Sequence, residues 1–172
     1  MKKDIVILVS AMNMGGAQKV VSILSNYWSE NGYSVTIINT FTKDKINYFH
    51  LNENINLKYL NNNPFFPKSY TFNLIWKLFQ LRKLIKIQNP HIVISFLTRV
   101  NIAAALSTLG MKCSLIVCER TWPPFRSLSK NLFWVYKILF NGIDKIIAQT
   151  GKSKSWLSEN FSGSTVEVIP NP

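Results

Sequence analysis

Two short segments of the chain carry residue types that could act on a phosphorylated ligand. Gly15 and Gly16 follow an apolar run and precede a helix-forming stretch. Adjacent glycines let the backbone approach a ligand closely, and the free N–H groups at a helix N-terminus attract phosphate. A tight turn without any ligand explains the pair equally well. Glu119 and Arg120 follow another apolar run, where either a local ion pair or a role at a sugar or phosphate is possible.

The spacing of the candidate residues excludes several common binding and catalytic motifs. The glycine pair is not part of a G-x-G-x-x-G motif, and no Gly-Lys-Ser/Thr follows it as in a Walker loop. The second predicted strand ends at Asn39-Thr40, without an acidic residue for a ribose. His50 and His91 have no partners at metal-ligand or triad spacing, and the two cysteines form no zinc pattern. We therefore expect no metal and no cofactor in this domain.

Alternating short apolar runs and longer helical stretches must position these residues. The pattern predicts strands at residues 5–9, 35–39, 55–60, 91–96, 115–118, 145–148 and 166–169. It predicts helices at residues 17–28, 72–88, 101–109, 128–140 and 152–161. Such alternation indicates an α/β fold with a doubly wound, mostly parallel, Rossmann-like sheet. Ligands bind beyond the carboxyl ends of such strands, so the candidate loops are residues 10–16, 96–101, 119–125 and 149–152.

Composition narrows the class of protein. A chain of 172 residues with 47% hydrophobic content suits one domain with a sizeable core. The formal net charge of +12 favours anionic partners. Nucleic acid is not expected among them, because the basic residues are spread out and no nucleic-acid-binding motif occurs. No apolar run reaches the roughly 18 residues of a spanning helix. Without a secretory signal, a cytoplasmic setting is expected.

The predicted helix at residues 72–88 is both basic and amphipathic. Its apolar face is formed by Leu74, Leu78, Leu81 and Ile85. Away from that face, or on its flank, lie Trp76, Lys77, Phe79, Arg82, Lys83 and Lys86, and Phe65-Phe66 lie just upstream. Trp76 and the four basic residues suit contact with an anionic membrane surface or a pyrophosphate. The alternative is an ordinary crossover helix with a solvated basic face.

Four segments, in order along the chain, resemble the retaining glycosyltransferases of family 4, which have the GT-B fold. They are Met14-Gly15-Gly16-Ala17-Gln18-Lys19-Val20, Ile94-Ser95-Phe96-Leu97 with Asn101, Val117-Cys118-Glu119-Arg120, and Val166-Glu167-Val168-Ile169-Pro170-Asn171-Pro172. The subgroup resembled extends glycans on polyprenyl-pyrophosphate carriers or similar envelope glycolipids. The sequence departs from the family at Gln18, usually Glu, at Arg120, often His, and at Trp122-Pro123-Pro124, which replaces a more polar loop.

The resemblance implies the N-terminal half of a GT-B architecture. Residues 1–168 would form the acceptor-side domain and residues 169–172 the start of an interdomain linker. The C-terminal donor domain would be absent from this sequence. Because the family's E-x7-E element lies in that second domain, the chain alone is expected to be inactive.

The resemblance also implies a reaction and its residues. A hexose or N-acetylhexosamine would pass, with retention, from a nucleotide sugar (a UDP-sugar is expected) to a lipid-linked or envelope glycan at the inner face of the membrane. Gly15 and Gly16 would face the donor diphosphate. Thr98 and Asn101 would line the acceptor side, with Glu119 and Arg120 as catalytic residues. The alternative from another class is a non-catalytic basic α/β module that binds a phosphorylated ligand or an anionic membrane.

Overall fold

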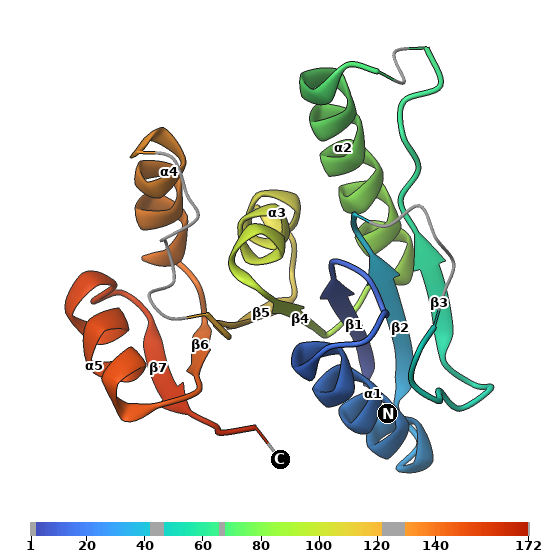
Figure 1. Cartoon of the computed structure of the whole chain (residues 1–172), viewed down its shortest axis with the longest axis horizontal. Helices are drawn as coiled ribbons and strands as arrows, with labels where there is room; N and C mark the ends of the chain where they lie inside the picture. The colour runs from blue at the N-terminus through green and yellow to red at the C-terminus, as the bar shows by residue number, and fades with distance from the viewer. Residues whose placement is uncertain (1–2, 42–46, 66–67, 122–129, 172) are drawn as a thin grey trace.

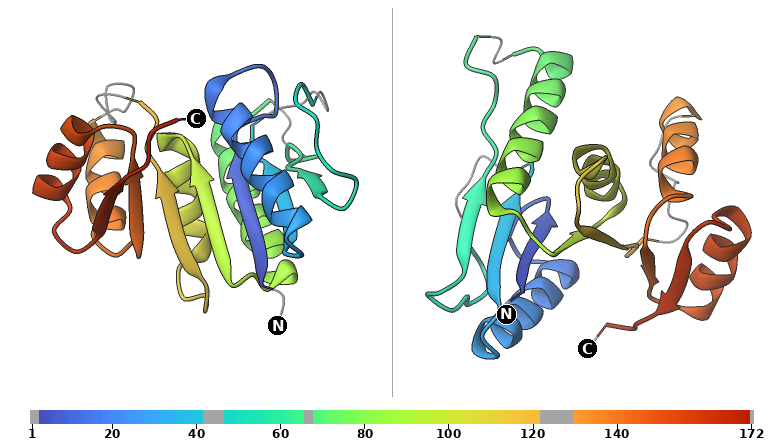
Figure 2. Two further views of the ribbon diagram at one scale, coloured as in Figure 1. Left: turned by 90° about the horizontal axis from the view of Figure 1, so that it is seen from below. Right: turned by 180° about the vertical axis from the view of Figure 1, so that it is seen from behind.

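The computed structural model describes residues 3–41, 47–65, 68–121 and 130–171 of an α/β domain (Figures 1 and 2). The described strands are β1 (Asp4–Val9), β2 (Ser34–Asn39), β3 (Asn56–Tyr59), β4 (Ile92–Phe96), β5 (Ser114–Cys118), β6 (Lys145–Ala148) and β7 (Thr165–Val168). The described helices are α1 (Gly16–Glu30), α2 (Tyr70–Gln88), α3 (Thr98–Thr108), α4 (Lys130–Phe140) and α5 (Gly151–Asn160). The predicted order of elements is confirmed. Phe66, residues 122–125 and Pro172 lie outside the described residues.

The seven strands form one sheet in the order β3-β2-β1-β4-β5-β6-β7, and all neighbouring pairs are parallel. The doubly wound sheet expected from the sequence is therefore confirmed. The central strands are runs of β-branched and other apolar residues because helices can cover both of their faces. In β1, Ile5 to Val9 are all buried. The direction of winding reverses between β1 and β4, which makes this pair the switch point of the sheet.

The helices are distributed unequally over the two faces of the sheet. α2, α3 and α4 lie on one face and α1 lies on the other (Figure 1). Leu157 and Phe161 of α5 pack into the same core as α2, α3 and α4. The second core is formed by the opposite side chains of the strands, together with Val20 and Val21 of α1. This unequal cover follows from the winding, because α1 alone connects strands on its side of the switch point.

The connection between β2 and β3 packs along α1 rather than forming a helix of its own in its described part. The backbone carbonyl of His50 accepts hydrogen bonds from Ser22 Oγ (2.7 Å) and Asn26 Nδ2 (3.0 Å). The Asn26 side chain also accepts a hydrogen bond from the backbone N–H of Asn52 (2.9 Å). His50 thus holds the connection through its backbone.

α2 is fixed to the core and to α3. Leu81 and Ile85 are buried, as the sequence predicts, whereas Leu74 of the same predicted apolar face is 37% exposed. Arg82 is not free at the surface. Its Nη1 donates hydrogen bonds to the backbone oxygens of Ser107 (3.0 Å) and Leu109 (2.8 Å) at the C-terminal end of α3. A cation is favourable there because the helix end carries partial negative charge.

An aromatic cluster joins α4 to α5. Tyr136 stacks on Phe140 with ring centroids 3.9 Å apart, and Phe161 meets Phe140 at 5.6 Å. All three side chains are fully buried. Each such ring removes a large apolar area from water, so this cluster is a main source of stability at the β6–β7 end of the sheet.

We expect Phe140→Ala to lower the free energy of unfolding by about 3–5 kcal/mol, because it leaves a cavity beside Tyr136 and Phe161. Phe79→Ala is the matched control, since Phe79 is 64% exposed, and should change stability by no more than about 0.5 kcal/mol. Urea unfolding followed by circular dichroism measures both. Equal effects of the two substitutions would contradict the assignment of the core.

Candidate functional site

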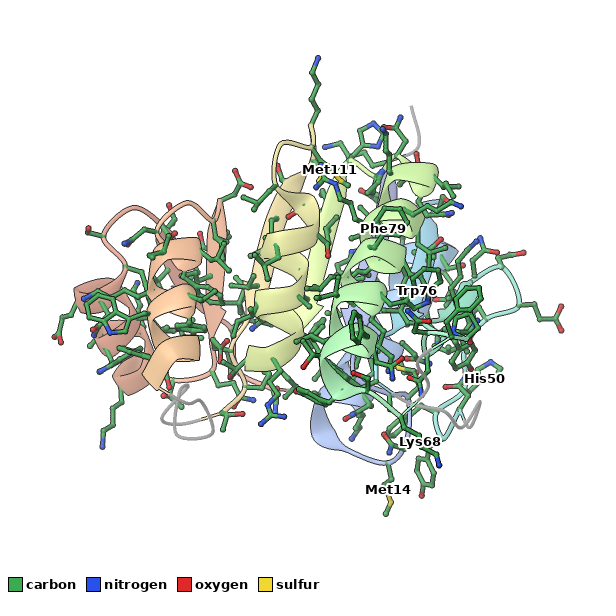
Figure 3. The ribbon with its side chains drawn as sticks, turned by 90° about the horizontal axis from the view of Figure 1, so that it is seen from above. Met14, His50, Lys68, Trp76, Phe79 and Met111 are labelled. Carbon is green, nitrogen blue, oxygen red and sulfur yellow. The ribbon has the colours of Figure 1, made fainter. Side chains whose placement is uncertain are left out.

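The loops that follow β1 and β4 flank the switch point at the carboxyl edge of the sheet. In doubly wound folds, ligands bind in the crevice outside this point. After β1 the chain passes through the exposed Met14 to Gly15 and the start of α1. Met14 and Lys68 lie at this end of the molecule, and Met111 lies at the opposite end (Figure 3). The carboxyl edge is therefore the place to look for a site.

The two glycines of the first loop have different surroundings. Gly15 has an extended backbone, and a Cβ at this position would collide with the side-chain oxygen of Gln18. Gly16 is the first residue of α1, and a Cβ there would meet no described atom within 4 Å. A side chain at position 15 would require the flexible Gln18 side chain to move, and the extended backbone there does not itself demand glycine. At position 16 the glycine leaves open space in front of a helix N-terminus, where an anion is favoured.

A buried carboxylate lies at the carboxyl end of β5. Glu119 is 3% exposed, and it accepts hydrogen bonds from Thr98 Oγ1 (2.9 Å) and Asn101 Nδ2 (2.6 Å). Asn101 Nδ2 also donates to the backbone oxygen of Cys118 (3.2 Å), and Asn101 Oδ1 accepts from Ser95 Oγ (2.7 Å). The network joins β4, α3 and β5 in one polar cluster inside an apolar core.

Burial sets the protonation of this cluster. Removal from water raises the pKa of Glu119 from its ordinary 4.5 to about 7, against the hydrogen bonds from Asn101 and Thr98, which lower it. The Tyr136 hydroxyl is also buried, and no described atom satisfies hydrogen-bond geometry with it. Its pKa is raised by burial first and then by the nearby Glu119 carboxylate. Glu119 can therefore exchange a proton close to neutral pH.

The structure brings together three of the residues predicted from the sequence and adds others. Thr98, Asn101 and Glu119 contact one another directly. Ser95 and Tyr136 were missed, because a serine in a buried strand and a tyrosine in an aromatic helix gave no local signal. Leu97 was missed as well: its φ of 76° is a left-handed conformation that strains a leucine, and it lies between β4 and α3 at the switch point.

Glu119 and Arg120 point to opposite sides of the sheet and are not paired with each other. Arg120 lies on the α1 side, where its guanidinium is 5.4 Å from the centroid of the Phe96 ring. Its Nη1 donates a hydrogen bond to Asn171 Oδ1 (2.6 Å). The local ion pair considered from the sequence is therefore not formed, because consecutive residues of an extended chain alternate between the two faces.

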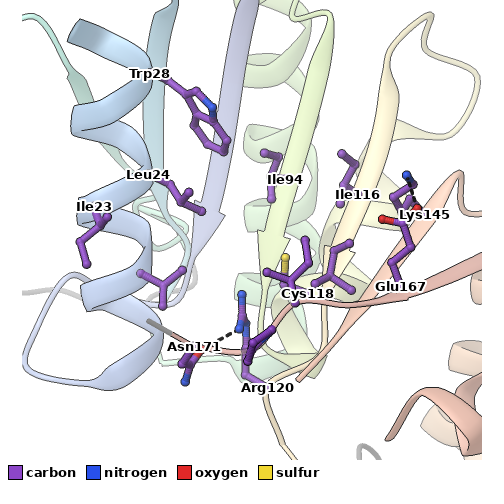
Figure 4. Close-up of a pocket in the computed structure, with 14 residues that line it drawn as sticks. Ile23, Leu24, Trp28, Ile94, Ile116, Cys118, Arg120, Lys145, Glu167 and Asn171 are labelled. Atoms are coloured by element: carbon purple, nitrogen blue, oxygen red, sulfur yellow. Dashed lines mark hydrogen bonds and ion pairs between the residues drawn. The ribbon is translucent and has the colours of Figure 1, made fainter. Parts of the chain in front are cut away.

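Arg120 borders an apolar groove of about 640 Å³ between α1 and the segment after β7 (Figure 4). Leu24 and Trp28 of α1 form one wall, and the floor is formed by Ile94, Ile116, Cys118 and Ile147 of the sheet. Burial raises the pKa of Cys118 to about 11, so its thiol is neutral. The ion pair between Lys145 and Glu167 (2.8 Å) lies at the groove's far side. The groove leaves part of the α1 face of the sheet uncovered.

Two smaller and more polar cavities lie at the carboxyl edge. One, of about 340 Å³, is lined by Glu119, Thr121, Gln149, Thr150, Lys152 and Ser153. Thr150 caps α5 there by accepting a hydrogen bond from the Ser153 N–H (3.2 Å). The other, of about 270 Å³, is lined by Phe41, Asn62, Lys68, Tyr70, Asn73, Leu74 and Lys77. We take the cavity at Glu119 as the candidate site, because it combines a titratable group with the edge where ligands of this fold bind.

Two features do not occur in the described part of the chain. Within residues 3–41, 47–65, 68–121 and 130–171, no three His, Cys, Asp or Glu side chains are grouped so that they could hold a metal ion. None of the helices in these ranges is both long and apolar enough to cross a membrane.

Comparison with known proteins gives a family and a fold. The model of Glycosyltransferase Family 4 matches residues 14–172, which is most of the chain. No curated protein matches the chain.

Three solved structures illustrate the fold. Sucrose-phosphate synthase from Thermosynechococcus elongatus matches with a TM-score of 0.73 and 12% identity, over 98% of this chain and 48% of its own. HepE from Anabaena, in complex with UDP-glucose, matches with a TM-score of 0.68 and 12% identity, over 98% of this chain and 44% of its own. A glycosyltransferase from Rickettsia africae matches with a TM-score of 0.67 and 19% identity, over 98% of this chain and 43% of its own. The chain thus spans about half the length of these proteins, and its fold is that of the N-terminal half of GT-B glycosyltransferases.

The raised pKa of Glu119 predicts a pH dependence of stability. Because the folded pKa of about 7 lies above the unfolded value of 4.5, the contribution of Glu119 is fully present below pH 4.5 and is lost as the pH rises through about 7. We expect this loss to be about 3 kcal/mol in the free energy of unfolding, and to be absent in Glu119→Gln, which resembles the protonated acid. Urea unfolding at several pH values measures it, and parallel pH profiles of the two proteins would contradict it.

Proposed function

This chain belongs to Glycosyltransferase Family 4, a retaining family, and on that premise we propose that it is the acceptor-side domain of a nucleotide-sugar glycosyltransferase. The proposed reaction moves a hexose or N-acetylhexosamine to a lipid-linked or envelope glycan. The observation that carries the proposal is the extent of the family match. It begins at residue 14, beside the glycine turn, and continues to residue 172, so it includes nearly every loop at the carboxyl edge.

The proposed donor is a UDP-sugar. HepE from Anabaena, which shares this fold, has been solved with UDP-glucose and also with UDP and glucose. In our chain the N-terminus of α1 and the open space at Gly16 suit a diphosphate. Backbone N–H groups fixed at a helix N-terminus would stabilise the charge that develops on the diphosphate as it leaves. The uridine and most of the sugar would be held by a second domain facing this edge.

The proposed acceptor side is the cavity at Glu119. In the transfer, the acceptor oxygen forms a bond to the anomeric carbon, the bond from that carbon to the diphosphate breaks, and the acceptor hydroxyl loses its proton. Glu119, with a pKa of about 7, is placed to accept that proton at neutral pH. Thr98 and Asn101 orient its carboxylate through their hydrogen bonds.

Arg120 contributes a positive charge from the other side of the strand. We assign it to the leaving diphosphate, and this role requires its hydrogen bond to Asn171 to open. A lipid-linked acceptor would also place the domain on the cytoplasmic, inner face of a membrane as a peripheral protein. The net charge of +12 supports such a location, because anionic lipid attracts basic proteins.

We expect Gly16→Val to abolish most of the transfer activity in a protein that carries this domain together with its donor-binding half. A Cβ at position 16 meets no described atom within 4 Å, so we expect the fold to accept the substitution and the diphosphate to be obstructed. A loss of at least about a hundredfold in kcat/KM is expected, comparable to the removal of one donor from an oxyanion site. The assay follows transfer of labelled glucose or N-acetylglucosamine from the UDP-sugar to a polyprenyl-pyrophosphate-linked glycan.

Thr108→Val, which alters a buried hydroxyl bonded within α3 and far from the carboxyl edge, serves as the control for general damage. Circular dichroism of each variant establishes that it is folded. Full activity of a folded Gly16→Val enzyme would restrict the glycine turn to a structural role. A parent protein that transfers no sugar from any UDP-sugar would favour the non-catalytic module instead.

A further inference from the structure

The outer side of α2 is apolar where a crossover helix of this fold is normally polar. Its inner side is already packed, since Leu81 and Ile85 are buried in the core. On the outer side Phe72, Ile75 and Phe79 follow one another at helical spacing and are 53%, 60% and 64% exposed. Hydrophobic burial within the domain therefore does not explain these three residues.

Further exposed residues lie toward both ends of α2. In the segment before α2, Phe65 is 81% exposed. Toward the C-terminal end of α2, the same side carries the exposed Lys83 and Lys86. We define the α2 face as Phe72, Ile75, Phe79, Lys83 and Lys86. Contiguous exposed apolar side chains of this kind mark an interaction surface.

The part of the chain that contains this surface carries charged side chains of one sign. Residues 54–118, which include α2 and α3, contain no aspartate or glutamate. The same stretch contains eight basic residues: Lys58, Lys68, Lys77, Arg82, Lys83, Lys86, Arg99 and Lys112. A partner that is negatively charged at its surface and apolar beneath it would complement such a face. An anionic lipid bilayer has both properties.

A second helix on the same face of the sheet shows a similar pattern (Figure 1). In α4, Trp134 and Ile138 are 63% and 72% exposed. The Nζ of Lys137 lies 5.8 Å from the centroid of the Trp134 ring. Exposed aromatic and aliphatic side chains mixed with lysine are typical of helices that lie in the membrane interface.

We propose that the α2 face docks this domain on an anionic bilayer. The aromatic and aliphatic side chains insert at the boundary between headgroups and acyl chains, and Lys83 and Lys86 bind headgroup phosphates. Because α2 begins at the carboxyl edge of the sheet, docking through Phe72 and Ile75 at its N-terminal end holds that edge beside the bilayer. The inference rests on the proposed function only in this last respect, which explains how a lipid-linked acceptor would reach the site.

The structure changes the residue set that the sequence suggested for this contact. Arg82 is held by the carbonyl oxygens of α3. Lys77 and Trp76 are half-buried, and Lys77 lies 5.8 Å from the centroid of the Phe41 ring. Ile75 and Phe79, by contrast, are more exposed than Trp76, so they take its place as the inserted residues.

The test is co-sedimentation of the chain with vesicles of phosphatidylglycerol and phosphatidylcholine in equal amounts, and with vesicles of phosphatidylcholine alone, at low and high salt. Lys83→Gln/Lys86→Gln should weaken binding to the anionic vesicles by about thirtyfold at low salt and by less at high salt. Ile75→Gln/Phe79→Gln should weaken it by at least about tenfold at both. All four side chains are exposed, so the variants should fold, as circular dichroism will establish.

Two variants on other elements are matched controls with the same chemistry. Lys19→Gln/Lys154→Gln removes the same charge, and Ile23→Gln/Tyr27→Gln changes exposed apolar residues of α1 across the sheet. Both should bind like the parent chain. Docking through α2 is overturned if the α2 variants and the controls bind equally, or if the parent binds neither vesicle.

Sedimentation velocity without lipid tests whether the α2 face binds a second copy of the chain rather than a membrane. Self-association of the parent chain through Ile75 and Phe79, without binding to the vesicles, would overturn the proposal. That result would identify the α2 face as an interface between copies. The vesicles contain neither donor nor acceptor glycan. Failure to bind them would therefore contradict membrane docking alone, and the transfer assay would test the proposed reaction separately.

Discussion

A carboxylate that leaves water must find hydrogen-bond donors inside the protein, and Glu119 imposes this requirement on the centre of the fold. Its donors, Thr98 and Asn101, belong to the first turn of α3. They can reach the carboxyl end of β5 only if the chain turns sharply after β4. The positive φ of Leu97 provides that turn. The first turn of α3 and the carboxyl end of β5 are thus joined through one buried carboxyl group.

The same constraint sets the protonation of the candidate site. A fully apolar residue in place of Glu119 would need none of these partners, so the network is a cost that packing alone does not justify. What the cluster provides is a carboxyl group held in one orientation with a pKa near neutrality. Groups of this kind are concentrated at functional sites, and this one borders a cavity at the edge of the sheet where ligands bind.

The fold could be predicted from the sequence because its signals are local. Continuous β-branched runs such as residues 5–9, alternating with helical spacing, are sufficient to indicate a parallel sheet. Glu119 could be selected because it follows a strand end, whereas Thr98 and Asn101 were selected through the family resemblance. The opposite directions of Glu119 and Arg120 were also implicit in the alternation of an extended chain. The bond from Ser95 to Asn101, the burial of Tyr136 beside Glu119 and the bond between Arg82 and α3 depend on tertiary packing, which no local pattern encodes.

The bond from Arg82 to the last turn of α3 has a mechanical consequence. One end of α3 is fastened to α2 by that guanidinium, and the other end is fastened to Glu119 by Thr98 and Asn101. A helix of this length, about 16 Å from end to end, moves as a rigid body. A displacement of α2 is therefore transmitted to the first turn of α3 without passing through a flexible loop. Whatever holds α2 in place also sets the position of the Glu119 carboxylate.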